Sequence, residues 1–212
     1  MTLRWHVPFL LFLAAATASA QITVTSNADT NTTGTLRWAI GQANSSGGAA
    51  TINLDPGLGT IMLTSELPVV YNRFGLTVNG NGRVIDGANA YRPFFLGLAP
   101  DTTFGFSETT GAVWNINNLT LQNTAAIGGN GGGGTRFGGG GGAGLGGGVF
   151  VNAGALTLTD VRFVNNAARG GNGGTVGTTS FGNGYSGGGG LGGAGGAGGG
   201  GGGGGGWGTS AS

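Results

Sequence analysis

Short apolar runs recur along residues 22–127, and polar turn residues separate them. Runs of three to five residues, bounded by Gly, Pro, Asn or Asp, are typical of short β-strands. Strands this short suit a coil that turns a corner every few residues better than a sandwich with long hairpins. The pattern predicts strands at Ile22–Thr25, Thr51–Leu54, Ile61–Leu63, Gly75–Val78, Arg83–Ile85 and Pro93–Leu96.

One segment, Thr35–Asn44, has helical rather than strand spacing. Its apolar residues Leu36, Ile40 and Ala43 fall on one face of a helix. Thr33 or Thr35 is a suitable N-cap, and Asn44 with Gly47 is a suitable end. The sequence therefore predicts a single short helix near the N-terminus.

An internal repeat is the strongest pattern in the chain. Residues 115–132 align without gaps to residues 157–174, with apolar residues on apolar residues and the Gly-Gly-Asn-Gly-Gly motif recurring 42 positions later. Repeats of this length indicate stacked coils that bury equivalent side chains against one another. We therefore expect Leu121 to lie over Phe163 inside a column. We expect Asn123 and Asn165 to stack at a corner, where Asn tolerates left-handed backbone.

Glycine divides the chain into two parts: 13 of its 54 glycines precede Gly128, and 41 lie from Gly128 onward. About half of the 42-residue repeat is the glycine stretch 128–148, which leaves room for three short strands and their corners. Each coil is therefore expected to release one glycine loop at a shared corner. Two interpretations of these loops stay open: a flexible fringe with exposed amides for surface contact, or tolerated insertions without a role.

The N-terminus has the pattern of a secretory leader. Arg4 precedes a short apolar run, and Ala18-Ser19-Ala20 supplies small residues for cleavage after Ala20. The run is too short to span a bilayer, and no other segment is apolar enough, so we expect no transmembrane segment. The expected organisation is a leader at 1–20, a strand and capping helix at 21–50, coils at 51–175 with a glycine loop at 128–148, and a glycine-rich tail at 176–212.

Loss of the leader narrows the available chemistry. The one histidine, His6, leaves with it, and the chain has no Cys and no Lys. A Ser-His-Asp or Cys-His nucleophile then has no base, and zinc or iron has no imidazole or thiolate ligand. Seven Arg and seven acids remain after Ala20, so the net charge is zero and nucleic acid is not an expected partner. We expect no cofactor and no metal.

Several segments of the sequence resemble those of a known protein family. The segment Gly34–Asn44 looks like the "C-S-L-R-E-A-I-x-x-A-N" signature of bacterial right-handed parallel β-helix proteins, which include autotransporter passengers and relatives of polymorphic outer-membrane proteins. Residues 51–80, 118–132 and 160–174 are similar to the same group. Two departures are Thr35 and Trp38, which stand where the group has Cys and Glu. The usual long continuation is also absent, so we expect an N-terminal part of a longer product.

The resemblance implies an all-β fold: a right-handed parallel β-helix, which is a pectin-lyase-like solenoid, with a short N-terminal capping helix and glycine-rich loops. A cap is also a physical expectation, because an uncovered solenoid end exposes apolar core and unpaired strand edges. The group is exported to the extracellular space or the bacterial outer-membrane surface. Surface glycans or proteins of a host or the environment are the implied partners, and the sequence favours no oligomeric state.

We favour structural over functional explanations for the remaining motifs. Gly-x-Gly-x-x-Gly strings follow from glycine abundance, and no acid follows Asp160 to make a calcium repeat. Asp101 and Glu108 are the acids nearest in sequence, and Asp86 could line a groove with Arg83 and Arg92, although turn roles are favoured. Asp160 and Arg162 are interpreted as a surface ion pair. Five aromatic residues are interpreted as packing residues rather than a carbohydrate platform: Phe94, Phe95, Phe104, Phe106 and Trp114.

These observations name no catalytic, cofactor or metal residue. The expected function is that of a non-enzymatic exported surface or secreted β-helix protein, adhesin-like or similar to an autotransporter passenger. One alternative is a polysaccharide-active lyase or hydrolase of the pectin-lyase-like class. A second alternative is a glycine-rich structural matrix protein.

Overall fold

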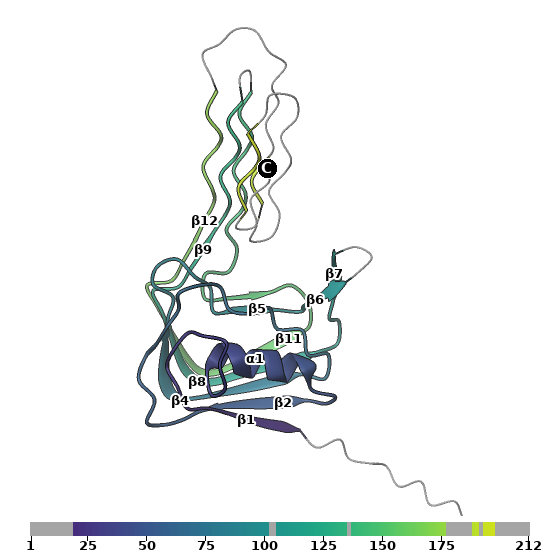
Figure 1. Cartoon of the computed structure of the whole chain (residues 1–212), viewed down its shortest axis with the longest axis vertical. Coiled ribbons are helices and arrows are strands. Elements are labelled where there is room, and N and C mark those ends of the chain that lie inside the picture. The colour runs from purple at the N-terminus through teal and green to yellow at the C-terminus, as the bar shows by residue number, and fades with distance from the viewer. Residues whose placement is uncertain (1–18, 102–104, 135–136, 177–187, 191–192, 198–212) are drawn as a thin grey trace, which may run out of the picture.

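The computed structural model describes residues 19–101, 105–134, 137–176, 188–190 and 193–197 (Figure 1). Of the predicted leader, only Ser19 and Ala20 lie within this part of the chain. The fold is rich in β-structure, and the described residues contain one helix. In chain order the elements are β1 (Ala20–Val24), α1 (Leu36–Ser45), β2 (Ala50–Leu54), β3 (Ile61–Met62), β4 (Leu76–Asp86), β5 (Phe94–Leu96), β6 (Leu98–Asp101), β7 (Gly105–Glu108), β8 (Val113–Gln122), β9 (Ala125–Ile127), β10 (Val149–Val151), β11 (Ala155–Val164) and β12 (Ala167–Arg169).

A parallel sheet forms the body of the molecule. Its strands follow the order β1-β2-β4-β8-β11, and β3 pairs with the second half of β4. Each strand therefore lies beside the equivalent strand of the preceding pass of the chain, an arrangement called the strand stack below. Parallel neighbours need a long connection, and here the connections run through the helix, the loops and the smaller strand pairs.

The predicted repeat is confirmed as an in-register pair of strands. Strands β8 and β11 pair with Asn115 opposite Thr157 and Leu121 opposite Phe163, which is the 42-residue offset read from the sequence. The same register continues downward, because Leu121 also lies opposite Ile85 of β4. Repeat positions are thus neighbours in space, as the alignment predicted. The expectation that Phe163 lies inside the column is wrong, because its side chain is 47% exposed.

Two corners shape each pass of the chain. The first lies inside the long strands, where Asn81, Asn118 and Asp160 have φ of 50, 47 and 53°. It explains why the predicted strands Gly75–Val78 and Arg83–Ile85 merge into β4, with a register shift between them. The second corner has Asn123 and Asn165 at φ of 48 and 52°, which confirms the predicted left-handed Asn.

The core is a column of apolar side chains from the inward positions of successive strands. On β8 these positions are Trp114, Ile116, Leu119 and Leu121, each at most 2% exposed. At the N-terminal end of the column, the apolar face of α1 packs over β1 and β2, and its residues Leu36, Ala39, Ile40 and Ala43 are buried in the same core. Thr35 is the N-cap, as predicted, and its hydroxyl accepts from the Trp38 amide at 3.3 Å. The end of the helix differs from the prediction, because Ser46 is the C-cap.

A buried ion pair fastens the helix to a distant loop. Arg37 donates to both carboxylate oxygens of Asp29, at 2.8 and 2.9 Å from Nη2, and to the Glu66 carbonyl at 2.6 Å from Nη1. Asp29 also accepts from the Thr64 amide and hydroxyl, at 2.7 and 3.0 Å. The Asp29 side chain is 1% exposed, so these bonds replace its water.

Outward-facing amides form a ladder along the stack. Asn53 donates to Gln21, Asn79 donates to Asn53, and Asn117 donates to Asn79, at 3.1, 2.8 and 3.1 Å. Each amide therefore bonds to the strand before it. Such ladders reinforce in-register stacking.

Three smaller pairings complete the body. Strands β5 and β10 are parallel, and Val70 adds an isolated bridge to Leu96 of β5. Strands β9 and β12 are parallel, with Ala125 opposite Ala167. The third pair, β6 and β7, is an antiparallel hairpin that the sequence reading missed.

The described glycine segments form backbone hydrogen bonds with one another. Gly128, Gly131 and Gly134 donate their amides to the carbonyls of Arg169, Asn172 and Thr175 at 2.8, 2.7 and 3.1 Å. A bond at every third residue is the period of the extended left-handed helix with three residues per turn. A Cβ on Gly131 would collide with the Gly139 carbonyl, and one on Gly171 would collide with the Gly129 carbonyl. The interior thus admits only glycine.

We call these segments the glycine bundle: residues 128–134, 137–148, 170–176, 188–190 and 193–197. Figure 1 shows the bundle running away from the strand stack. Of the two interpretations left open by the sequence, its bonded amides argue against a flexible fringe with exposed amides, for the described residues. The expectation of a glycine loop from each coil is also wrong in part, because the chain passes from β4 to β5 through only seven residues, 87–93.

Candidate functional site

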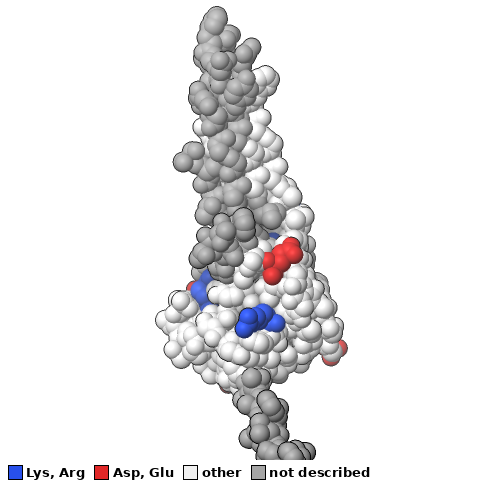
Figure 2. Space-filling view, turned by 90° about the vertical axis from the view of Figure 1, so that its right-hand side faces the viewer, with Lys and Arg blue, Asp and Glu red and all other residues white. Residues whose placement is uncertain are grey.

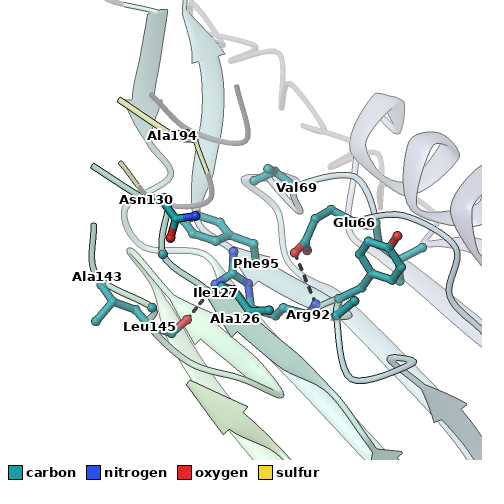
Figure 3. A pocket seen from close by; sticks show the side chains of 16 residues that line it. Glu66, Val69, Arg92, Phe95, Ala126, Ile127, Asn130, Ala143, Leu145 and Ala194 are labelled. Carbon is teal, nitrogen blue, oxygen red and sulfur yellow. Dashed lines mark hydrogen bonds between the residues drawn. The ribbon is translucent and has the colours of Figure 1, made fainter. Parts of the chain in front are cut away.

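A groove of about 420 Å³ lies where the glycine bundle meets the strand stack. Its walls come from the loop at Glu66, the segment 90–92 before β5, the end of β9, and the glycine segments at 128–130 and 143–145. Figure 3 shows Glu66, Arg92 and Phe95 around this groove. We call it the junction groove.

Arg92 is the central side chain of the junction groove. It is 9% exposed, and its Nη1 donates to the Leu145 carbonyl at 2.7 Å. Its guanidinium lies 4.9 Å from the ring centre of Phe95 and 5.7 Å from that of Phe150. The two rings are themselves 4.9 Å apart. Arg92 therefore connects the base of the glycine bundle to an aromatic pair of the body, through contacts worth roughly 1–2 kcal/mol each.

Glu66 faces Arg92 across the groove. The Arg92 amide donates to Glu66 Oε1 at 3.4 Å (Figure 3). Partial desolvation raises the pKa of Glu66, and the charges of Arg92 and Arg37 lower it by less. Burial in turn lowers the pKa of Arg92. A carboxyl group with a raised pKa beside an arginine is a feature that also occurs at binding and catalytic sites.

The groove limits the chemistry that its described residues can perform. Glu66 is the one carboxylic acid among the residues that line it. Hydrolysis of a glycosidic bond by two acids therefore has no second acid among these lining residues. Tyr91, Phe95 and Asn130 also line the groove, and together they offer aromatic faces and an amide to a polar, neutral ligand.

Asp86 lies at a corner and not in the junction groove. Its carboxylate accepts from the Ala88 amide at 2.8 Å, from Gln122 at 2.8 Å and from Asn123 at 2.9 Å. Desolvation raises its pKa, but these hydrogen bonds outweigh it, so the pKa of Asp86 lies below its ordinary value. The favoured interpretation as a turn residue is thereby supported.

The other charged residues singled out from the sequence do not gather either. Arg83 donates to the Leu58 carbonyl at 2.9 Å rather than to Asp86. Asp101 and Glu108 lie at opposite ends of the β6–β7 hairpin, about 10 Å apart along the strands. Asp160 lies at the first corner and makes no ion pair with Arg162 within the described part of the chain, so that predicted pair is wrong.

Three of the five aromatic residues singled out from the sequence are described with their side chains, and all three are packed. Phe94, Phe95 and Trp114 are 0, 4 and 1% exposed, and Trp114 Nε1 donates to the Ala153 carbonyl at 3.2 Å. This confirms the packing interpretation for these three residues. Phe104 and the side chain of Phe106 lie outside the described part.

Sequence reasoning missed Glu66 and Tyr91 as groove residues. Glu66 follows the predicted strand Ile61–Leu63, but nothing in its spacing indicates that Arg92, 26 residues later, lies beside it. The signal that existed was a lone acid beside Leu67-Pro68 in an otherwise uncharged stretch.

On the face that Figure 2 shows, the few charged side chains are scattered and form no second charged cluster.

Searches of protein-family models, curated proteins and solved structures found no match to this chain. Among the described residues, no helix is long and apolar enough to cross a membrane. The same residues contain no group of three potential metal ligands of the His, Cys, Asp or Glu type.

Proposed function

We propose that this chain is an exported, non-enzymatic surface or secreted protein of the right-handed parallel β-helix class, adhesin-like or similar to an autotransporter passenger. In this proposal the strand stack is a rigid body, and the glycine bundle carries contact surface away from it. The expected partners are surface glycans or proteins.

The observation that carries the proposal is the shared origin of the two glycine excursions. Strands β9 and β12 pair in register, with Ala125 opposite Ala167, and each leads directly into glycine. The excursions then bond to each other, through Gly128 to Arg169 and Gly131 to Asn172. A projecting, hydrogen-bonded bundle is a costly structure for an insertion without a role, because every ordered glycine loses backbone entropy.

Binding to arrayed glycans and surface proteins tests the proposal. The purified chain is compared with Gly131→Ala, which places a Cβ against the Gly139 carbonyl, and with Gly140→Ala, where a Cβ meets nothing within 4 Å. We expect binding that Gly131→Ala weakens and Gly140→Ala leaves unchanged. Binding that neither variant alters would contradict the proposal that the glycine bundle carries the contact surface.

Export is tested separately. Expressed with residues 1–20 in a Gram-negative host, the chain is expected outside the cytoplasm with Gln21 as its first residue. An uncleaved product that stays in the cytoplasm would contradict the export part of the proposal.

The enzyme alternative is favoured by one observation, the raised pKa of Glu66 beside Arg92 in the junction groove. Incubation with pectin, alginate and hyaluronan distinguishes the two. Release of unsaturated or reducing sugar ends that Glu66→Gln abolishes would replace the non-enzymatic proposal. Unchanged polysaccharides would support it.

A further inference from the structure

The last strand of the stack presents an uncovered apolar face. Positions that are buried on β8 are exposed at their register partners on β11. Ile116 is 2% exposed but its partner Leu158 is 40% exposed, and Leu121 is 0% exposed but its partner Phe163 is 47% exposed. Val151 of β10, on the neighbouring pair, is 36% exposed. We call this face, made by Leu156, Leu158, Val161, Phe163 and Val151, the open end.

The open end also has an unpaired backbone edge. In the described part of the chain, β11 pairs with β8 on one side and has no strand on the other. The ten residues of this edge measure roughly 33 Å along the strand, which bends at Asp160, and their outward amides and carbonyls are available to another strand. An exposed apolar edge of this length favours pairing with another chain.

At the opposite end of the stack β1 is also an edge strand in the described part, but the apolar column there is covered. There α1 covers the column, and Ile22 and Val24 of β1 are only 8 and 0% exposed. A head-to-tail contact would therefore place Leu158 and Phe163 against an end whose core residues are already covered by α1. A contact that joins two identical ends is closed, and it leaves no site for further growth.

The side-chain pattern of β11 is self-complementary about its corner. Its inward residues are Leu156 and Leu158 before Asp160, and Val161 and Phe163 after it. In an antiparallel pairing with a second copy, residues facing each other point to the same side of the sheet. If Leu156 faces Phe163 of the second copy, Leu158 faces Val161, and all inward residues meet inward residues. In that register the outward Thr157 faces Arg162.

From this geometry we infer that two copies of the chain join at their open ends, with β11 antiparallel to β11 of the second copy in the register that places Leu156 opposite Phe163. The inference depends on the strand stack and not on the proposed function. It converts the exposed apolar face into a continuous core and satisfies both strand edges.

The oligomeric state across a concentration series tests this pairing. Sedimentation of the purified chain is expected to show a monomer–dimer equilibrium. Phe163→Ser should weaken it about 100-fold, because two phenyl groups leave the interface. The matched control is Phe74→Ser, which removes a phenyl of similar exposure (48%) elsewhere on the surface and should leave the equilibrium unchanged. A monomer at every concentration, or equal weakening by both variants, overturns the inference.

Crosslinking tests the register without depending on how Phe163→Ser folds. The chain has no cysteine, so an introduced one is unique. Thr157→Cys and Arg162→Cys proteins are mixed and oxidised, and a disulfide-linked heterodimer is expected, since facing residues lie at disulfide distance. A mixture of Val113→Cys with Arg162→Cys is the control and should stay uncrosslinked, because Val113 lies on β8. Dimers that do not crosslink at 157 and 162 would overturn the proposed register.

Discussion

Leu121 and Phe163 occupy the same register position on neighbouring strands, but Leu121 is fully buried and Phe163 is 47% exposed. The difference arises because a strand lies on each side of β8, whereas β11 is the last strand of the stack among the described residues. Equivalent residues of a repeat therefore contribute unequally to the free energy of unfolding. The contribution depends on whether another strand covers the residue.

Truncation of these two side chains should have unequal effects on stability. Leu121→Ala creates a cavity in the column and should lower the free energy of unfolding by about 2–5 kcal/mol. Phe163→Ala should cost about 1–2 kcal/mol, because half of the ring already contacts water. Urea unfolding at a concentration where the chain is monomeric measures both. Equal losses would contradict the assigned burial.

Removal of the Arg37 guanidinium should destabilise the chain strongly. Arg37→Ala leaves the Asp29 carboxylate buried without its cation, at a cost of about 3–5 kcal/mol. Arg73→Ala is the control, because Arg73 is exposed and lies over the ring of Phe74; its effect should be within about 0.5 kcal/mol. Thermal and urea unfolding of the three proteins give the comparison. A loss for Arg37→Ala no larger than the control would show that the ion pair contributes nothing.

Acid should destabilise the fold through Asp29 and Asp86. Burial raises the pKa of Asp29, but hydrogen bonds from Thr64 and Arg37 outweigh it, so its pKa lies below the ordinary value, as does that of Asp86. A carboxyl with a lowered folded pKa stabilises the fold above its unfolded pKa of about 3.9, and this contribution is lost as the pH falls through the folded pKa. Unfolding free energies measured between pH 7 and pH 2 should therefore decline below about pH 4. Asp29→Asn should be less stable at pH 7 and show a shallower decline; a parallel profile would contradict the assignment.

Much of the body followed from the sequence because its signals are local. The short apolar runs between turn residues located β1, β2 and β5, and Thr35 marked the start of the helix. The repeat placed β8 beside β11, since identical spacing in a stacked fold means neighbouring positions. The merging of two predicted strands into β4 was not visible, because the left-handed Asn81 interrupts the apolar pattern without ending the strand.

The glycine bundle and the junction groove could not be predicted in the same way. A glycine run contains no apolar periodicity, so the bonds from Gly131 to Asn172 and from Gly195 to Asn130 leave no trace in composition. Glu66 and Arg92 come together only because separate passes of the chain stack. No local sequence pattern indicates that these two residues are neighbours. The β6–β7 hairpin was missed because Pro100 lies inside a strand, where proline is disfavoured.

Close packing of the glycine bundle gives a position-specific prediction. Gly131→Ala should raise amide exchange across residues 128–134 and 170–175, because its Cβ collides with the Gly139 carbonyl, while the strand stack keeps its unfolding transition. Gly140→Ala should leave exchange unchanged, because its Cβ meets nothing within 4 Å. Hydrogen exchange by mass spectrometry distinguishes the variants. Equal exchange in both would mean that the glycine segments are not packed.

Successive passes of the chain stack in register, and an engineered disulfide between two neighbouring strands measures that register. Asn117 and Thr159 are register partners on β8 and β11, both facing outward, in a chain without cysteine. Their Cα atoms lie within disulfide range, whereas those of Asn117 and Thr157, two residues out of register, lie roughly 8 Å apart and beyond it. Oxidation of the Asn117→Cys/Thr159→Cys protein should give a complete intramolecular disulfide, and Asn117→Cys/Thr157→Cys should give almost none. Equal crosslinking of the two pairs, or none in the first, would contradict the stack.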